Sequence, residues 1–414
     1  MFSLTVAACG IGMFCTHLAA SAQPVPVDLG TLMSEAVTQH PDVRSRKSNA
    51  RAAGYELEGA RWGRYPSLTT ELQTQSGGPQ TVIKVEQPLW TGGRITSRIG
   101  VADAGVGEAE AAVAEIEQNV LGQTAGAFFE ILRLESRLDA ARASETEHKR
   151  LFDIIQRRVQ SQVSPATDQT QAAARLNQAI TERIQTQRQI EAARLALEQM
   201  VGRKVAELAP PPHIGLGNWN EDSLLDAALS FSPERRRLEA QVAVANAQID
   251  LARSQLMPTV VAGYQSRLGN LLPGEDRGRL YVALQLQTGA GLSSMSGVQV
   301  AISRKQAALD AIDALERTLT QQVRSIWSER QALGRQVEPV RALLSGADEI
   351  VASYLRQFQV GRKNWLDVLN ALREKTQAYY ALADLESPIL YAEVRLLLLA
   401  GQLNAQNPIP NHVR

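Results

Sequence analysis

The chain has 414 residues, of which 44% are hydrophobic and 5% aromatic, and its 43 basic residues balance its 43 acidic residues. The hydrophobic content excludes wholesale disorder, and the zero net charge gives no electrostatic reason to expect nucleic acid as a partner. Abundant Ala, Gln, Leu and Arg, which lose little conformational freedom in a helix, favour a mainly α-helical protein.

Residues 1–22 are predicted to form a signal peptide. No charged residue occurs before Asp28, residues 4–14 are mostly apolar, and residues 20–22 (ASA) offer a small-residue cleavage site. The basic residue that usually follows the first Met is missing, so an uncleaved anchor is one alternative, and lipidation at Cys9 is another. Cleavage after Ala22 would remove Cys9 and Cys15 and leave an exported chain without disulfides.

Two halves of the chain resemble each other and indicate an internal repeat. Residues 32–36 and 40–42 (LMSEA and HPD) are echoed by residues 224–228 and 232–234 (LLDAA and SPE). The same spacing separates Pro41 from Pro233 and Pro66 from Pro258. We therefore predict structural repeats at 23–201 and 222–404, joined by an irregular connection at 202–221 and followed by a flexible tail at 405–414.

Each repeat is predicted to contain a helix, two strands, a very long helix, a turn and a further helix. The strands are expected at 67–75, 80–89, 259–267 and 279–288. In the last of them Leu280, Val282 and Leu284 alternate with Tyr281 and Ala283, which gives one apolar and one wettable face. Strands of this length can cross a bilayer when tilted.

The long helices are expected at 94–161 and in the matching part of the second repeat, through Phe358. Small or apolar residues recur in steps of three, four and seven, which predicts a heptad-like seam. At about 1.5 Å per residue such a helix spans roughly 100 Å, more than a compact domain holds. Pro339 is expected to bend or break the second long helix.

Both long helices end at predicted hairpin tips. In the first, Ser164 is expected to cap the next helix, Pro165 to take its first position and Asp168 to lie in its first turn. In the second, Gly361 ends one helix and Asn364 begins another, with Asp367 placed like the acid of a capping box.

Four strands cannot close into a barrel, and an open sheet edge in lipid leaves backbone groups without partners. The chain is therefore expected to form oligomers, which would also gather the long helices around one axis. A continuous duct from the membrane to the hairpin tips would result.

Residues 87–94 (QPLWTGGR) resemble the strand-to-helix junction of TolC-type outer-membrane efflux proteins, and the repeated segments around Pro41 and Pro66 resemble theirs. The resemblance extends from about residue 28 to 404. The strand-to-helix junction is assigned to Pro88, Trp90, Gly92 and Gly93. The resemblance implies a mainly α fold with a membrane β-barrel portion, in which a homotrimer shares a twelve-stranded barrel and long antiparallel helices form an α-helical barrel.

The resemblance also implies an outer-membrane exit duct that extends into the periplasm. Its implied partners are outer-membrane lipid, a periplasmic adaptor (membrane fusion) protein and an inner-membrane ABC or RND-type pump. Passive export of protein by a type I secretion system is the first interpretation, and multidrug efflux is the alternative. A non-conducting periplasmic coiled-coil scaffold is the alternative from another class.

The pore entrance and adaptor-docking region is implied at the two tips, namely Gly361, Arg362, Lys363, Trp365, Asp367, Ser164 and Asp168. Some family members have a second acid one turn beyond the first, but this chain has Asn370, so only Asp367 fits an acidic ring. Asp367 as a helix cap alone is the competing interpretation. Arg362 and Lys363 could pair with acids of neighbouring helices or remain solvated.

Trp90 and Tyr65 bracket strand ends, where aromatic rings favour the membrane interface, although packing at a junction would also explain them. The five histidines lack metal-ligand spacing, and no nucleophile motif or phosphate-binding glycine loop occurs. We therefore expect no enzymatic activity, cofactor or metal.

Overall fold

A computed structural model describes residues 26–75, 78–205, 207–210, 215–269, 276–286, 289 and 293–404. The predicted signal peptide and tail lie outside the described residues. The helices and strands are, in chain order, α1 (Leu29–Gln39), α2 (Pro41–Trp62), β1 (Ser67–Gln75), β2 (Gly78–Trp90), α3 (Arg94–Gln160), α4 (Ala166–Val201), α5 (Glu221–Phe231), α6 (Pro233–Ser254), β3 (Thr259–Gly269), β4 (Gly278–Gln285), α7 (Ser293–Gln359) and α8 (Trp365–Leu399).

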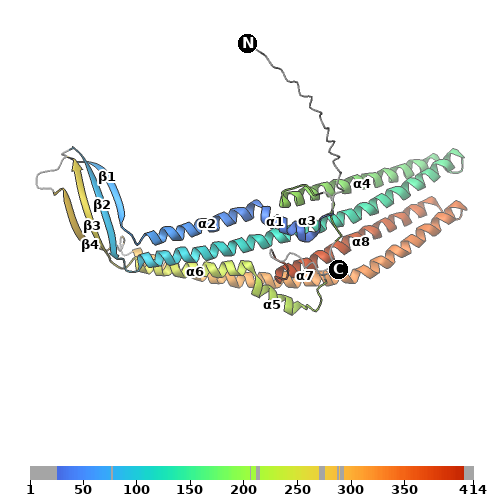
Figure 1. The fold of residues 1–414 in the computed structure, drawn as a ribbon. Helices are drawn as coiled ribbons and strands as arrows, with labels where there is room; N and C mark the ends of the chain where they lie inside the picture. The colour runs from blue at the N-terminus through green and yellow to red at the C-terminus, as the bar shows by residue number, and fades with distance from the viewer. Residues whose placement is uncertain are drawn as a thin grey trace, which may run out of the picture.

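The molecule is elongated, with the sheet at one end and the α3–α4 and α7–α8 hairpin tips at the other (Figure 1). The order of helices and strands from α1 to α4 recurs from α5 to α8. Each half has two helices before its strands where one was predicted, because Pro41 and Pro233 each begin a second helix. The duplication as such stays a prediction.

Helices α3 and α7 each contain 67 residues, as the long apolar seams predicted. Pro339 lies inside α7, which continues to Gln359, so the helix does not break there, and a bend at Pro339 stays a prediction. A proline removes one backbone hydrogen bond, whereas buried side chains on both sides of it, including Ile326 and Ala347, pack α7 against its neighbours.

The four strands form one antiparallel sheet in the order β1-β2-β3-β4, so β1 and β4 are its edges. The register places large hydrophobic side chains on one surface, which we call the apolar face. Its exposed members are Leu68, Leu72, Val85, Tyr264, Leu268, Leu280, Val282 and Leu284. The predicted alternation in β4 is therefore confirmed.

The opposite surface, the polar face, carries a hydrogen-bonded group from two strands. The Tyr281 hydroxyl donates to Glu86 Oε1 at 2.7 Å, and Lys84 Nζ lies 2.7 Å from the same oxygen. An added Cβ on Gly263, which lies opposite Tyr281, would collide with the Tyr281 ring. Glycine at this position therefore makes room for the tyrosine.

The main hydrophobic core lies midway along the molecule. It joins α1, the middle of α3, the end of α4, α5, α7 and the end of α8, and its fully buried side chains include Leu32, Phe128, Leu197, Leu224 and Leu396. This core holds the two halves of the chain together between the sheet and the tips. Of the helices described, none is both long and apolar enough to span a membrane.

Candidate pore entrance at the hairpin tips

The second tip turns where Gly361 adopts a left-handed conformation. Gly361 has φ +75°, its N–H donates to the Phe358 carbonyl at 3.1 Å, and the Arg362 N–H donates to the Gln357 carbonyl at 2.9 Å. This pair of bonds is a Schellman motif, which favours glycine at its left-handed position. The predicted helix end at Gly361 is confirmed.

The first tip makes the same motif without glycine. Gln162 has φ +58°, its N–H donates to the Val159 carbonyl at 2.9 Å, and the Val163 N–H donates to the Arg158 carbonyl at 2.8 Å. Sequence reasoning missed this position because nothing about glutamine marks a left-handed turn.

Ser164 does not cap helix α4, contrary to the prediction. Pro165 is the N-cap with an extended backbone and makes no side-chain cap, while Ser164 Oγ accepts a hydrogen bond from Arg158 Nε at 3.5 Å. The extended Pro165 moves the helix start one residue later, to Ala166. Asp168 lies in the first turn, as predicted.

Asn364 caps helix α8, since its Oδ1 accepts from the Leu366 N–H at 3.4 Å. The Asp367 carboxylate lies 3.5 Å from Lys363 Nζ, whose ammonium also lies 4.4 Å from the centre of the Tyr354 ring. Asp367 and Asp168 each occupy the third position of their helix. The two tips thus present corresponding carboxylates.

Trp365 is only 4% exposed. It packs in a tip cluster made of Leu151, Ile155, Ala172, Phe358, Trp365, Val368 and Leu369. Because these side chains come from α3, α4, α7 and α8, Trp365 joins the two hairpins. Arg362 is exposed, and no ion pair involves it within the described residues.

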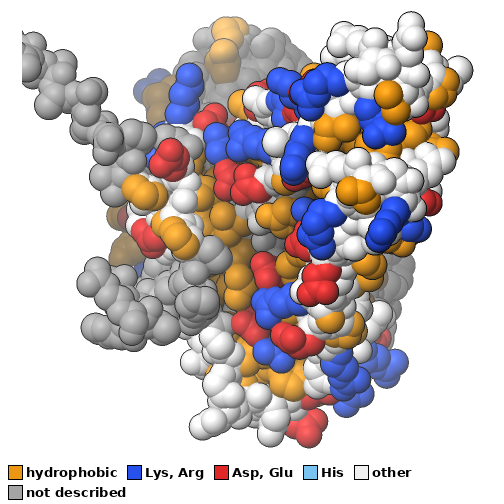
Figure 2. Space-filling view, turned by 90° about the vertical axis from the view of Figure 1, so that its right-hand side faces the viewer, with side chains coloured by type: hydrophobic (Ala, Val, Ile, Leu, Met, Phe, Trp, Pro, Cys, Tyr) orange, Lys and Arg blue, Asp and Glu red, His pale blue; other side chains and the backbone are white. Residues whose placement is uncertain are grey.

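Figure 2 looks onto the tip end and shows basic and acidic side chains interspersed there. Several charges bridge the hairpins. Asp384 of α8 binds two arginines of α3, Arg133 at 2.6 Å and Arg137 at 2.5 Å. Both ion pairs resist separation of α8 from α3.

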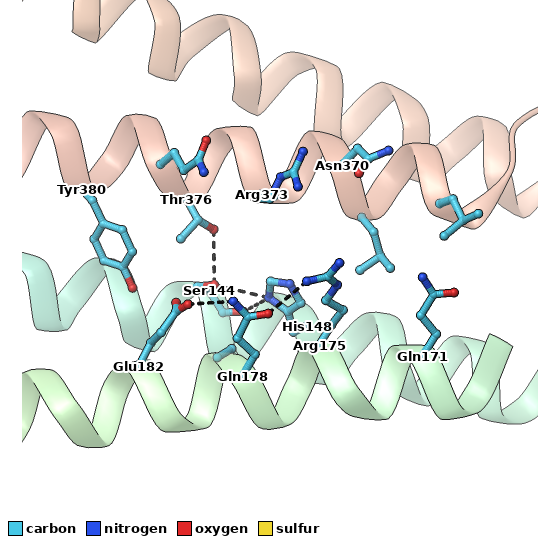
Figure 3. Close-up of a pocket in the computed structure, with 14 residues that line it drawn as sticks. Ser144, His148, Gln171, Arg175, Gln178, Glu182, Asn370, Arg373, Thr376 and Tyr380 are labelled. Carbon is cyan, nitrogen blue, oxygen red and sulfur yellow. Dashed lines mark hydrogen bonds between the residues drawn. The ribbon is translucent and has the colours of Figure 1, made fainter. Parts of the chain in front are cut away.

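A polar cavity of about 290 Å³ lies between α3, α4 and α8 (Figure 3). On its wall the Thr376 hydroxyl donates to Ser144 Oγ at 3.2 Å, and His148 Nδ1 lies 2.8 Å from the Ser144 carbonyl oxygen. Burial lowers the pKa of His148, an effect that the Ser144 hydrogen bond and the nearby Glu182 partly offset. Burial, with Glu182, raises the pKa of Tyr380. The lowered pKa favours the neutral form of His148 in this cavity.

The strand-to-helix junction lies at the sheet end, far from the tips (Figure 1). Gly92 and Gly93 have φ +58° and +86°, and Gly93 is the N-cap of α3. An added Cβ on Gly92 would collide with Met257, which connects α6 to β3. The corresponding connection between β4 and α7 lies partly outside the described residues. Its described Gly289 also has a positive φ, of +73°.

Among the described residues, no cluster of three or more His, Cys, Asp or Glu side chains is arranged to hold a metal ion. The described tip residues instead form a packed apolar cluster with charged side chains around it.

A helical body with an exposed apolar sheet face at one end and two hairpin tips at the other is the fold of solved outer-membrane channels such as OprN, which superposes with a TM-score of 0.77 at 18% identity. The chain belongs to the outer membrane efflux protein family, whose model matches residues 32–203 and 224–402.

Two relatives illustrate this membership. The alkaline protease secretion protein AprF of Pseudomonas aeruginosa is 23% identical over 304 residues, a match that covers 69% of this chain and 62% of AprF. The outer membrane efflux protein BepC of Brucella suis is 21% identical over 332 residues, or 78% of this chain and 72% of BepC. The chain thus spans less than two thirds of AprF.

Solved structures show the same fold. A membrane protein from Pseudomonas aeruginosa superposes with a TM-score of 0.77 at 20% identity, covering 90% of each chain. The outer membrane protein VceC from Vibrio cholerae gives a TM-score of 0.75 at 18% identity, covering 90% of this chain and 96% of VceC.

Proposed function

We propose that three copies of this chain form a passive exit duct that receives cargo from an inner-membrane pump through a periplasmic adaptor. The observation that carries this proposal is the open sheet, in which β1 and β4 are unpaired edges beside an exposed apolar face. Edges in lipid cost several kcal/mol for each unsatisfied backbone group, so the sheet needs partners. Three copies supply the twelve strands that the family resemblance implies.

Two measurements on the detergent-extracted protein test this proposal. Light scattering should give the mass of three chains, and insertion into a planar bilayer should give stepwise conductance. Recovery as a monomer in buffer without detergent would instead support the periplasmic scaffold.

We place the adaptor-docking surface on the exposed residues of the two tips. Arg362 and two apolar side chains, Val163 at 61% and Val360 at 69% exposure, are the accessible members. The buried Trp365 contributes by holding the tips together and not by direct contact. A photo-crosslinking residue at Arg362 should capture the adaptor, whereas the same residue at Arg46, on α2, should not.

The cargo follows from the pump that assembles with this duct. The match to AprF supports protein export, and the match to BepC supports efflux of small molecules as the alternative. Purification of the complex captured through Arg362 decides between them, because an ABC-type pump supports protein secretion and an RND-type pump supports small-molecule efflux.

A further inference from the structure

Exposed aromatic rings gather where the sheet meets the helices. The Trp62 and Tyr65 rings lie 5.2 Å apart and are 62% and 59% exposed. Trp90, at the end of β2, is 50% exposed. Large rings in contact with each other yet open to solvent mark a surface that is covered by a partner.

These rings adjoin the apolar face of the sheet. The register shifts between Pro88 and Trp90, and this bulge pairs Trp90 with Val260, a residue of the apolar face. Gln87, also on that face, donates through Nε2 to the Arg64 carbonyl at 2.9 Å and so fixes the turn that carries Tyr65. The bulge pairs Trp90 with a residue of the apolar face, and the hydrogen bond ties the turn before Tyr65 to a strand residue of the same face.

Two arginines flank Trp62. Arg61 and Arg64 are exposed, and across the described part of the chain neither guanidinium has an ion-pair or hydrogen-bond partner. Arg61 lies in the last turn of α2. Positive charge is thus left available beside the aromatic rings.

We propose that Arg61, Trp62, Arg64, Tyr65 and Trp90, here called the junction patch, bind the headgroups of anionic phospholipids in the periplasmic leaflet of the outer membrane. The inference rests on the proposed function, which places the apolar face in that membrane. Amphipathic rings are stable at the lipid-water interface, and guanidinium groups bind phosphate through paired hydrogen bonds. The bilayer is the occupant because the patch continues a lipid-facing surface and carries the complementary charge.

Tryptophan fluorescence of the full chain in lipid vesicles tests this proposal. The vesicles contain phosphatidylcholine with a minor fraction of either brominated phosphatidylglycerol or brominated phosphatidylcholine, whose bromines quench nearby tryptophans. We expect phosphatidylglycerol to quench more strongly, and Trp62→Phe to reduce the quenched emission. In the R61Q/R64Q variant the preference for phosphatidylglycerol should fall by about fivefold for each arginine.

The matched control is the R44Q/R46Q variant, which removes two exposed arginines from α2 at positions farther from the sheet. This variant should keep the preference for phosphatidylglycerol. If the channel conducts but both lipids quench equally, or if R61Q/R64Q keeps the preference for phosphatidylglycerol, the headgroup site is overturned and the proposed function stands. An absence of quenching by either lipid together with an absence of conductance would overturn the proposed function as well.

Discussion

Gln162 holds a left-handed backbone conformation at the first tip, where the second tip has Gly361. A side chain at such φ values destabilises the folded chain by about 1 to 2 kcal/mol. Glycine would remove this cost, but its greater freedom in the unfolded chain would offset part of the gain. Gln162→Gly should therefore raise the unfolding free energy by up to about 1 kcal/mol. Thermal melting in detergent measures this change. Gln156→Gly, inside α3, is the control and should be destabilised.

At the same scale, His148 should make stability depend on pH. Because its pKa is lowered in the folded chain, the unfolded chain binds its proton at higher pH, and stability falls as the pH drops below about 6.5. When the pH falls from about 7.5 to about 5, the melting temperature of the His148→Asn variant should drop less than that of the native chain. Parallel losses in both proteins would contradict the assignment.

Between neighbouring strands, Gly263 and Tyr281 form a matched pair. Gly263→Val would force the Tyr281 ring aside and break its hydrogen bond to Glu86, at a cost of about 1 to 3 kcal/mol. In a double-mutant cycle, Tyr281→Ser should remove much of the penalty of Gly263→Val. Additive losses of unfolding free energy would show that the two residues are independent.

For the whole molecule, the two faces of β4 should respond oppositely to charge. Val282 is 69% exposed on the apolar face, whereas Ala283 lies on the polar face. Val282→Lys should cost about 2 to 4 kcal/mol in the bilayer, while Ala283→Lys should be tolerated. The yield of folded protein in outer membranes measures both, and equal yields would argue against a lipid-facing sheet.

Threefold assembly should bring Asp367 of each chain near one axis and form a ring of negative charge that attracts cations. Asp367→Asn is then expected to reduce cation selectivity in single-channel recordings. Unchanged selectivity would contradict the acidic ring and would limit the role of Asp367 to its ion pair with Lys363.

Local patterns predicted much of this fold. The alternation at residues 280–284 fixed the two faces of β4, and Gly361 marked the second tip. Local sequence patterns predicted the helix ends less reliably where a residue type is compatible with more than one backbone conformation. Ser164 can cap a helix but does not, because Pro165 takes the N-cap position. Gln162 carries no signal for its left-handed turn.

The sequence by itself determined the two long helices, the four strands and the positions of both tips, because periodicity and turn residues act over a few neighbours. Only the tertiary structure decided that Trp365 is buried, that a bulge brings Trp90 to the apolar face, and that Ser144, Glu182 and Tyr380 line one cavity. These features depend on contacts between residues distant in the chain, whose packing no local pattern specifies.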